Sequence, residues 1–196
     1  MTHLAPVLGT GDLPFAELQA ARLDGELYAV DEFFSPVDSP LTTDARGLAL
    51  YRALSRFRGL EKRLVAEQWS AAWVWGAVFA PPYPHQFCAP VAIRARENAP
   101  QLGHVREVKL VRQEVLTVNG LRLTTPLRTA LDLVRSPGEF EPDELAVVGR
   151  LLDGAGLAVA DCVDALDDRR NIPQKKQALE RLARVPERLP LPDDSW

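Results

Sequence analysis

His85 and Cys88 are three positions apart in the segment His85-Gln-Phe-Cys88, and both side chains are able to bind a transition metal. A structural zinc site needs four ligands, which usually come as two close pairs. His104 is a distant third candidate. We therefore expect a histidine at the start of a strand and a buried thiol, with no metal and no other cofactor.

Ser70 is the residue whose surroundings come nearest to those of a nucleophile, but no Gly-x-Ser-x-Gly turn encloses it. An N-cap for the helix that follows explains this serine fully. Glu114 stands after Lys109 and Arg112 without the Asp and the Glu-x-Lys pattern of a restriction-type nuclease. Phosphate-binding glycine loops, HExxH and paired CxxC are also missing from the sequence. The sequence therefore predicts a protein that is not an enzyme.

Two further pairs stand four residues apart, the spacing that places side chains on one helix face. Arg128 and Asp132 are predicted to form a surface ion pair, worth roughly a few tenths of a kcal/mol. Trp69 and Trp73 share a face in the same way, whereas Trp75 points elsewhere. We expect the tryptophans to pack in the core, with stacking on a ligand as the alternative.

The charge is distributed unevenly along the 196 residues. The net charge is −6 over residues 1–48, +3 over 49–93, +4 over 94–135, −8 over 136–168 and +3 over 169–196. The basic middle indicates a surface for an acidic partner, either a protein or a nucleic acid, although solvated faces of mixed sign would give the same pattern. The candidate contact residues are Arg94, Arg96, Arg106, Lys109, Arg112 and Arg122.

Length and composition limit the class of protein. A chain of 196 residues with 46% hydrophobic and 26% charged residues fits one large or two small globular domains. No apolar run approaches the roughly 20 residues of a membrane helix, and no secretory signal is visible at the N-terminus. Two cysteines far apart indicate a reducing compartment, so we expect a cytoplasmic protein.

The pattern of apolar residues, caps and turns predicts an α+β fold. Asn119-Gly120 between two apolar runs is typical of a type I′ hairpin turn, because both positions need a positive φ. Thr124 or Thr125 is expected to cap the next helix, with Pro126 in its first turn. Predicted hairpins cover residues 27–37 and 115–124, predicted strands cover 86–93 and 105–111, and predicted helices cover 12–25, 43–59, 70–76, 124–134 and three segments after 141.

The stretch from Val118 to Val134 resembles a signature of the AbiEi family, the antitoxins of type IV toxin–antitoxin systems from abortive phage-infection loci. In that family a hairpin ending in G-x-x-V-T-x-P-x-R-T leads into a helix beginning L-L-D-L. The stretch Gln68 to Gly76 is similar to the family's S-A-A-x-x-x-G helix, and Leu18 to Val37 is similar to the wing of its winged helix. The residues of this chain that stand at motif positions include Ser70, Gly120, Thr125, Arg128, Thr129 and Asp132.

The resemblance implies three parts and two alternative functions. The parts are a truncated winged-helix-like unit (1–40), a central α/β domain with a mixed or antiparallel sheet (41–137), and C-terminal helices with a tail (138–196). We expect a non-catalytic antitoxin or partner-binding protein that opposes a neighbour-encoded, nucleotidyltransferase-like toxin without enclosing it. The alternative is a transcriptional regulator that binds double-stranded DNA through the wing. The oligomeric state is left open.

The N-terminal unit carries −6, which disfavours contact with phosphate. We therefore expect this unit to pack on the central domain as a structural cap. The side chains expected to make that contact are Phe15, Leu18, Leu27 and either Phe33 or Phe34.

Overall fold

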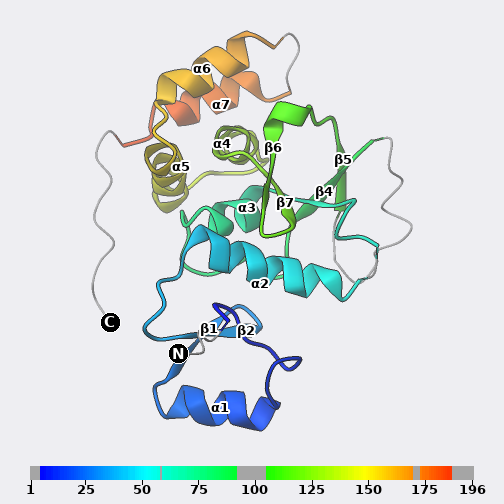
Figure 1. Ribbon diagram of the computed structural model, residues 1–196. Helices are drawn as coiled ribbons and strands as arrows, with labels where there is room; N and C mark the ends of the chain where they lie inside the picture. Colours follow the sequence, from blue (N-terminus) through cyan, green and yellow to red (C-terminus); the bar gives the residue numbers. More distant parts are fainter. Residues whose placement is uncertain (1–4, 58, 92–104, 170–172, 187–196) are drawn as a thin grey trace.

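The computed structural model describes residues 5–57, 59–91, 105–169 and 173–186, and within these ranges the α+β class is confirmed (Figure 1). The helices are α1 (Phe15–Leu23), α2 (Thr43–Ser55), α3 (Gln68–Val74), the 3-10 helix η3 (Arg112–Glu114), α4 (Pro126–Val134), α5 (Pro142–Gly154), α6 (Val159–Asp167) and α7 (Lys175–Leu182). The strands are β1 (Leu27–Val30), β2 (Phe33–Pro36), β3 (Val65–Ala66), β4 (Phe87–Pro90), β5 (Val105–Val108), β6 (Val115–Val118) and β7 (Leu121–Thr124).

The central sheet is mixed, so the antiparallel alternative is wrong. Its strand order is β5-β4-β3-β7-β6, and β3 pairs antiparallel with β4 but parallel with β7. β4 and β5 are also parallel. The parallel contact between Ala66 and Leu123 places the ends of β3 and β7 side by side, and a helix starts after each of them.

The predicted hairpin at residues 115–124 is confirmed. β6 and β7 are antiparallel, and the turn residues Asn119 and Gly120 have φ values of 46° and 86°. The Asn119 side-chain amide donates to the Asp44 carbonyl oxygen over 2.9 Å, which fixes the turn against the start of α2. At Gly47 of α2 a Cβ atom would lie 2.8 Å from Val118, so this glycine lets the helix approach the hairpin closely.

Helices lie on both sides of the sheet (Figure 1). α2 packs against β6 and β7, α3 contacts both α2 and α4, and α4 contacts α5, α6 and α7. The three predicted C-terminal helices are therefore present, and their apolar sides form one cluster with α4 around Leu133, Val148 and Leu166. No described helix has the length and apolar character that crossing a bilayer requires.

The N-terminal unit consists of α1 and the β1–β2 hairpin, and it lies beside α2 (Figure 1). Phe33 is buried in the main core together with Val7 and Val30, as expected for one of the two phenylalanines. The expectation for the other side chains is wrong. Leu18 and Leu27 form a separate small cluster with Leu8 and Phe34, and Phe15 is 61% exposed. These side chains stabilise the unit itself, because α1 packs on its own hairpin rather than on the central sheet.

Three acidic residues of this unit contact basic residues of the central part. Asp12 and Arg52 form an ion pair of 2.6 Å, Glu32 contacts Arg56, and Asp31 Oδ2 lies 3.0 Å from His85 Nε2. Two of these acidic side chains, Asp12 and Glu32, are therefore paired with arginines of α2 or its C-terminal end. The division of the chain at residues 40 and 137 stays a prediction.

The predicted helix starts are only partly right. Thr125 caps α4, with Pro126 in the first turn, as expected. Ser70 is no N-cap: it lies inside α3, and its Oγ accepts a hydrogen bond from the Gln86 backbone N–H over 2.8 Å. α2 starts at Thr43 as expected, and its N-cap is Thr42, whose side chain accepts a hydrogen bond from the Ala45 N–H over 3.2 Å. The helix predicted over 12–25 begins only at Phe15, and Asp12 lies before it, where its carboxylate accepts from the Gly9 N–H and from Arg52.

Trp69, Trp73 and Trp75 all lie against the core, but Trp69 and Trp73 do not share an environment. Trp73 is buried in the main core, whereas Trp69 stacks on Phe140 at 6.5 Å in the C-terminal cluster. Trp75 contacts both clusters, and its indole N–H donates to the Thr124 carbonyl oxygen over 2.9 Å. α3 lies between the two clusters. Trp69 and Trp73 therefore contact different clusters, although their spacing of four residues predicts that they share one helix face.

Candidate functional site

The residues of the Thr-Thr-Pro-x-Arg-Thr segment fix the start of α4. The Thr125 side chain accepts from the Arg128 backbone N–H over 3.3 Å. The Thr129 hydroxyl lies 2.9 Å from the Thr125 carbonyl oxygen and 2.7 Å from the Thr124 hydroxyl. All hydroxyl groups are thus occupied with the backbone and with one another, and the turn from β7 to α4 is rigid.

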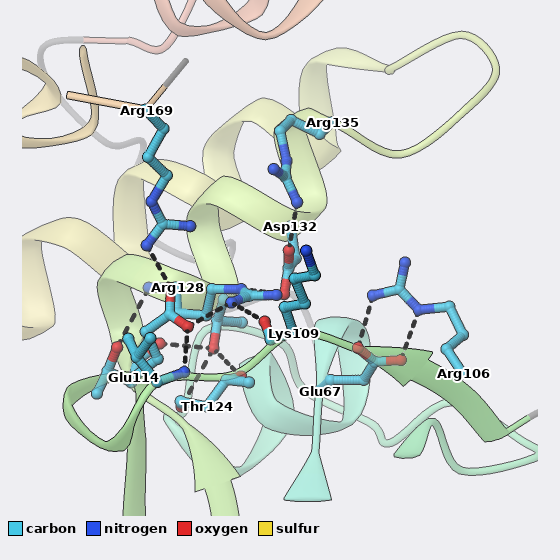
Figure 2. A network of polar contacts seen from close by, with 12 residues as sticks. Glu67, Arg106, Lys109, Glu114, Thr124, Arg128, Asp132, Arg135 and Arg169 are labelled. Carbon is cyan, nitrogen blue, oxygen red and sulfur yellow. Dashed lines mark hydrogen bonds and ion pairs between the residues drawn. The ribbon is translucent and has the colours of Figure 1, made fainter. Parts of the chain in front are cut away.

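Arg128 is the centre of a buried ion-pair network (Figure 2). Its Nε donates to Asp132 Oδ2 over 2.8 Å, and its Nη1 donates to Glu114 Oε2 over 2.6 Å. Nη1 also lies 3.3 Å from the carbonyl oxygen of Lys109. Arg128, Asp132 and Glu114 are 6%, 3% and 8% exposed. The expectation of a surface pair is therefore wrong, because the polar side of α4 faces η3 and the end of β5 rather than solvent.

Further arginines bind the outer sides of these carboxylates. Arg135 donates to Asp132 Oδ1 over 2.9 Å, and Arg169, just after α6, donates to Glu114 Oε1. A related pair lies at the end of β3, where Arg106 Nε and Nη2 donate to the two oxygens of Glu67 over 2.7 and 2.6 Å. A two-bond contact of this kind fixes the plane of the guanidinium.

The electrostatics of the network favour fixed ion pairs over proton transfer. Burial raises the pKa of Glu114, but the Val111 N–H and the guanidiniums of Arg169 and Arg128 outweigh it, so the pKa of this carboxyl lies below its ordinary value. Burial likewise raises the pKa of the Cys88 thiol, and it raises that of Cys162 to about 12. Neither thiol is therefore a thiolate at neutral pH.

The predicted contact residues lie in different environments. Lys109 and Arg112 are exposed, and Arg106 is held by Glu67. Arg122 lies on β7, and its side chain donates to the Lys62 carbonyl oxygen over 3.1 Å. Arg94 and Arg96 lie outside the described residues. The structure thus brings Arg106 and Lys109 to one side of the network (Figure 2), whereas Arg122 belongs to the hairpin.

Several network members escaped the sequence-based prediction, namely Glu67, Glu114, Arg135 and Arg169. The sequence does carry a signal for the burial of Arg128 and Asp132. Arg128 and Asp132 stand in a helix in which Ala130, Leu131 and Leu133 are apolar, so little of that helix remains to face solvent. Partners such as Arg169, 55 positions from Glu114 in the chain, give no local signal.

His85 and Cys88 are placed by other contacts. His85 pairs with Asp31, and Cys88 is fully buried on β4. Among the described residues no three metal-binding side chains come together. His104 lies outside the described residues.

Comparisons with known proteins address the family. No curated protein matches the chain. Among solved structures, the crystal structure of the RV2827C protein from Mycobacterium tuberculosis is similar, with 16% identity and a TM-score of 0.48 over 92% of this chain and 72% of that one. The family model of the AbiEi antitoxin C-terminal domain matches residues 65–183, which run from β3 to the end of α7 and include the whole network. With more than half of its length matched, the chain belongs to the AbiEi antitoxin family, and its role is related to a toxin–antitoxin system.

Proposed function

We propose that this chain is a non-catalytic antitoxin that counteracts its toxin by binding an acidic partner. The observation that carries the proposal is the set of basic side chains around α4, within the segment that matches the family. Arg106, Arg135 and Arg169 are each held by a buried carboxylate, while part of each arginine side chain stays exposed. Lys109 and Arg112 are exposed beside them.

The contacts of the network support a binding role rather than catalysis. A general base needs a carboxylate or imidazole that is free to accept a proton. Glu67, Glu114 and Asp132 instead accept hydrogen bonds from guanidiniums. Nucleophilic catalysis at the two cysteines is disfavoured by their burial.

The second candidate function is a DNA-binding regulator, favoured by the order of α1 and the β1–β2 hairpin, which is that of a helix followed by a wing. The tip of this hairpin argues against it. Asp31 and Glu32 are acidic and contact His85 and Arg56, so the tip offers no positive charge to a phosphate. We therefore rank this function second.

The test is neutralisation of the toxin in cells. The chain is expressed in a heterologous bacterium together with the product of the gene next to its own, which the proposal takes as the toxin, and growth is measured. We expect the chain to restore growth, and the Lys109→Gln/Arg112→Gln variant to lose at least about tenfold in colony count, as expected when two charge contacts are removed. Within the described residues neither side chain has an ion-pair partner, so this variant should fold normally.

Arg22→Gln/Lys176→Gln is the matched control, because it removes the same charge from exposed positions on α1 and α7. We expect it to neutralise the toxin like the unaltered chain. Failure of the unaltered chain to restore growth would overturn the antitoxin proposal. Equal loss in the two variants would show that the network surface has no special part in neutralisation.

A further inference from the structure

The central sheet has two outer strands, which differ in how well they are protected. β5, at one edge, carries the charged side chains of Arg106 and Glu107. β6, at the other edge, has the sequence Val115-Leu-Thr-Val118, with neither a charge nor a proline. Folded proteins usually protect an exposed edge with charges, prolines or bulges, because its unpaired backbone groups attract another strand. β6 lacks the first two of these devices, and its register with β7 is regular.

The turn after β6 determines which backbone groups this strand presents at the edge. In a two-residue hairpin loop, the flanking residues Val118 and Leu121 form a hydrogen-bonded pair, and bonded and non-bonded pairs then alternate along the strands. The Thr125 N–H donates to the Glu114 carbonyl oxygen over 2.9 Å, which agrees with this alternation. The odd-numbered residues of β6 therefore point their N–H and C=O groups away from β7.

Those outward groups belong to Val115 and Thr117. Among the described residues no strand lies beyond β6. The Val115 N–H is already occupied, because it donates to the Arg112 carbonyl oxygen at the end of η3. The Val115 C=O and both backbone groups of Thr117 are thus available to a further strand.

Exposed apolar surface lies along the same edge. Leu116 is 46% exposed, although Leu121 and Leu123, which point to the same face of the sheet, are fully buried. Val111, just before η3, is also exposed. A strand that bonds to the edge of β6 would therefore cover Leu116 as well as satisfy the outward backbone groups.

The sequence of β6 suits a second copy of itself. Antiparallel pairing about a two-fold axis at Leu116 places this leucine opposite its counterpart, because directly opposite residues share one face of a sheet. The same register aligns Val115 of each copy with Thr117 of the other. Each Thr117 N–H then donates to a Val115 C=O, and the two leucines cover one another on the face that packs on α2.

The charges at the two ends of β6 favour the same arrangement. Arg112 is exposed at the start of the strand, and Asp44 is exposed beside the turn at its end, where the Asn119 side chain contacts it. Two-fold pairing brings Arg112 of each copy to the turn of the other copy, and so toward Asp44. Arg122 stays outside the contact, because it lies one strand inward and donates to the Lys62 carbonyl oxygen.

We propose that two copies of this chain associate through their β6 edges, which joins the two central sheets into one continuous sheet. The inference goes beyond the proposed function, because it needs neither a toxin nor any other partner. One strand from each copy makes a small contact, so we expect reversible association in the micromolar range rather than a permanent dimer.

The first test is analytical ultracentrifugation of the full chain over a range of micromolar concentrations. We expect the mass to rise with concentration from that of a monomer toward that of a dimer. Leu116→Lys places two ammonium groups opposite each other at the axis, so it should weaken association at least about tenfold. Thr117→Pro removes an outward N–H and no bond to β7, and it should weaken association as well. Leu23→Lys, at a position of α1 that is 86% exposed, is the matched control and should leave association unchanged.

A disulfide cross-link tests the register. The proposed axis makes Leu116 and its counterpart a non-hydrogen-bonded pair, in which the Cα atoms lie about 4.5 Å apart, within the range that a disulfide spans. Leu116→Cys should therefore form an intermolecular disulfide with oxidised glutathione, whereas Leu23→Cys should form far less. The native thiols of Cys88 and Cys162 are buried, so they do not compete in this reaction.

Charge reversal tests the ends of the strand. Arg112→Glu should weaken association, because it places two carboxylates near each other. Arg112→Glu combined with Asp44→Arg re-forms the attraction with exchanged signs and should restore association. Circular dichroism and the unfolding midpoint of each variant check that it folds.

Three results would overturn the inference. One is a chain that stays monomeric at every concentration, and another is association that both Leu116→Lys and Thr117→Pro leave intact. The third is cross-linking of Leu23→Cys as fast as that of Leu116→Cys. A monomeric chain that neutralises the toxin would overturn only this inference, and the antitoxin proposal would stand.

Discussion

Arg128 and Asp132 are one helical turn apart on α4, and the guanidinium Nε lies 2.8 Å from a carboxylate oxygen in the interior of the protein. At the surface such a pair contributes little to stability, since water screens it. Here both side chains are removed from water, and each has a second charged partner, Glu114 for the arginine and Arg135 for the aspartate. The pair is therefore part of the framework that positions the basic surface.

Removal of one buried partner should destabilise the protein strongly. Asp132→Asn leaves Arg135 without its carboxylate and Arg128 with Glu114 alone, so the free energy of unfolding should fall by about 3 kcal/mol. Urea denaturation measures this change. Asp167→Asn is the control, because its contact with Lys175 is exposed, and it should cost no more than about 0.5 kcal/mol. Similar losses in the two variants would contradict the structural role of the network.

The stability of the network should depend on pH in the acidic range. The folded-state pKa of Glu114 lies below its ordinary value of 4.5, so its stabilising contribution is fully present above that value. The contribution is lost as the pH falls through the lowered pKa. Comparison of the unaltered chain with Glu114→Gln by urea denaturation should therefore show a difference that is constant near neutral pH and decreases below about pH 4.5. A difference that grows on acidification would be inconsistent with a lowered pKa.

The contact of the N-terminal unit with the core should depend on Phe33. Phe33 is buried in the main cluster, so Phe33→Ala should reduce the free energy of unfolding by about 3 kcal/mol or more. Phe15 is 61% exposed, and Phe15→Ala should change it by less than about 0.5 kcal/mol. Thermal and urea unfolding report both values. A loss for Phe15→Ala as large as that for Phe33→Ala would mean that α1 also packs on the core.

The β6–β7 turn should not tolerate a branched side chain at Gly120. Its φ is 86°, and a Cβ atom there would lie 3.2 Å from the Tyr51 ring. Gly120→Val should therefore destabilise by at least about 1 kcal/mol. Gly11→Ala, at a position with open space, should be nearly neutral in the same measurement. Equal stability of the two variants would argue against this turn.

Local signals predicted most of the elements. The Asn119-Gly120 turn, the Thr125 cap and the three C-terminal helices depend on residues close together in the chain, and each is present. The sequence did not distinguish a mixed sheet from an antiparallel one, because a strand as short as Val65–Ala66 carries little periodicity. Ser70 shows the same limit, since its hydroxyl bonds to Gln86 rather than to its own helix.

The candidate site was less predictable, because burial of charge depends on partners far along the chain. Glu114 forms ion pairs with Arg128 and Arg169, and the sequence around each of these residues gives no indication of the other two. Lys109 and Arg112 are exposed as a basic surface requires, whereas Arg122 is occupied with a backbone oxygen. Whether the surface binds a partner stays a prediction.

The short central strand has a consequence for how the protein folds during synthesis. β3 pairs with β4 on one side and with β7 on the other, and both partners are made later than β3 itself. On the ribosome, the nascent chain therefore carries Val65–Ala66 without a parallel neighbour until residue 124 has been added. The β1–β2 hairpin can form early from local contacts, but the core cluster to which Phe33 belongs is complete only after Leu121 and Leu123 of β7 emerge. Burial of the apolar side of the N-terminal half is thus delayed until more than half of the chain has been translated.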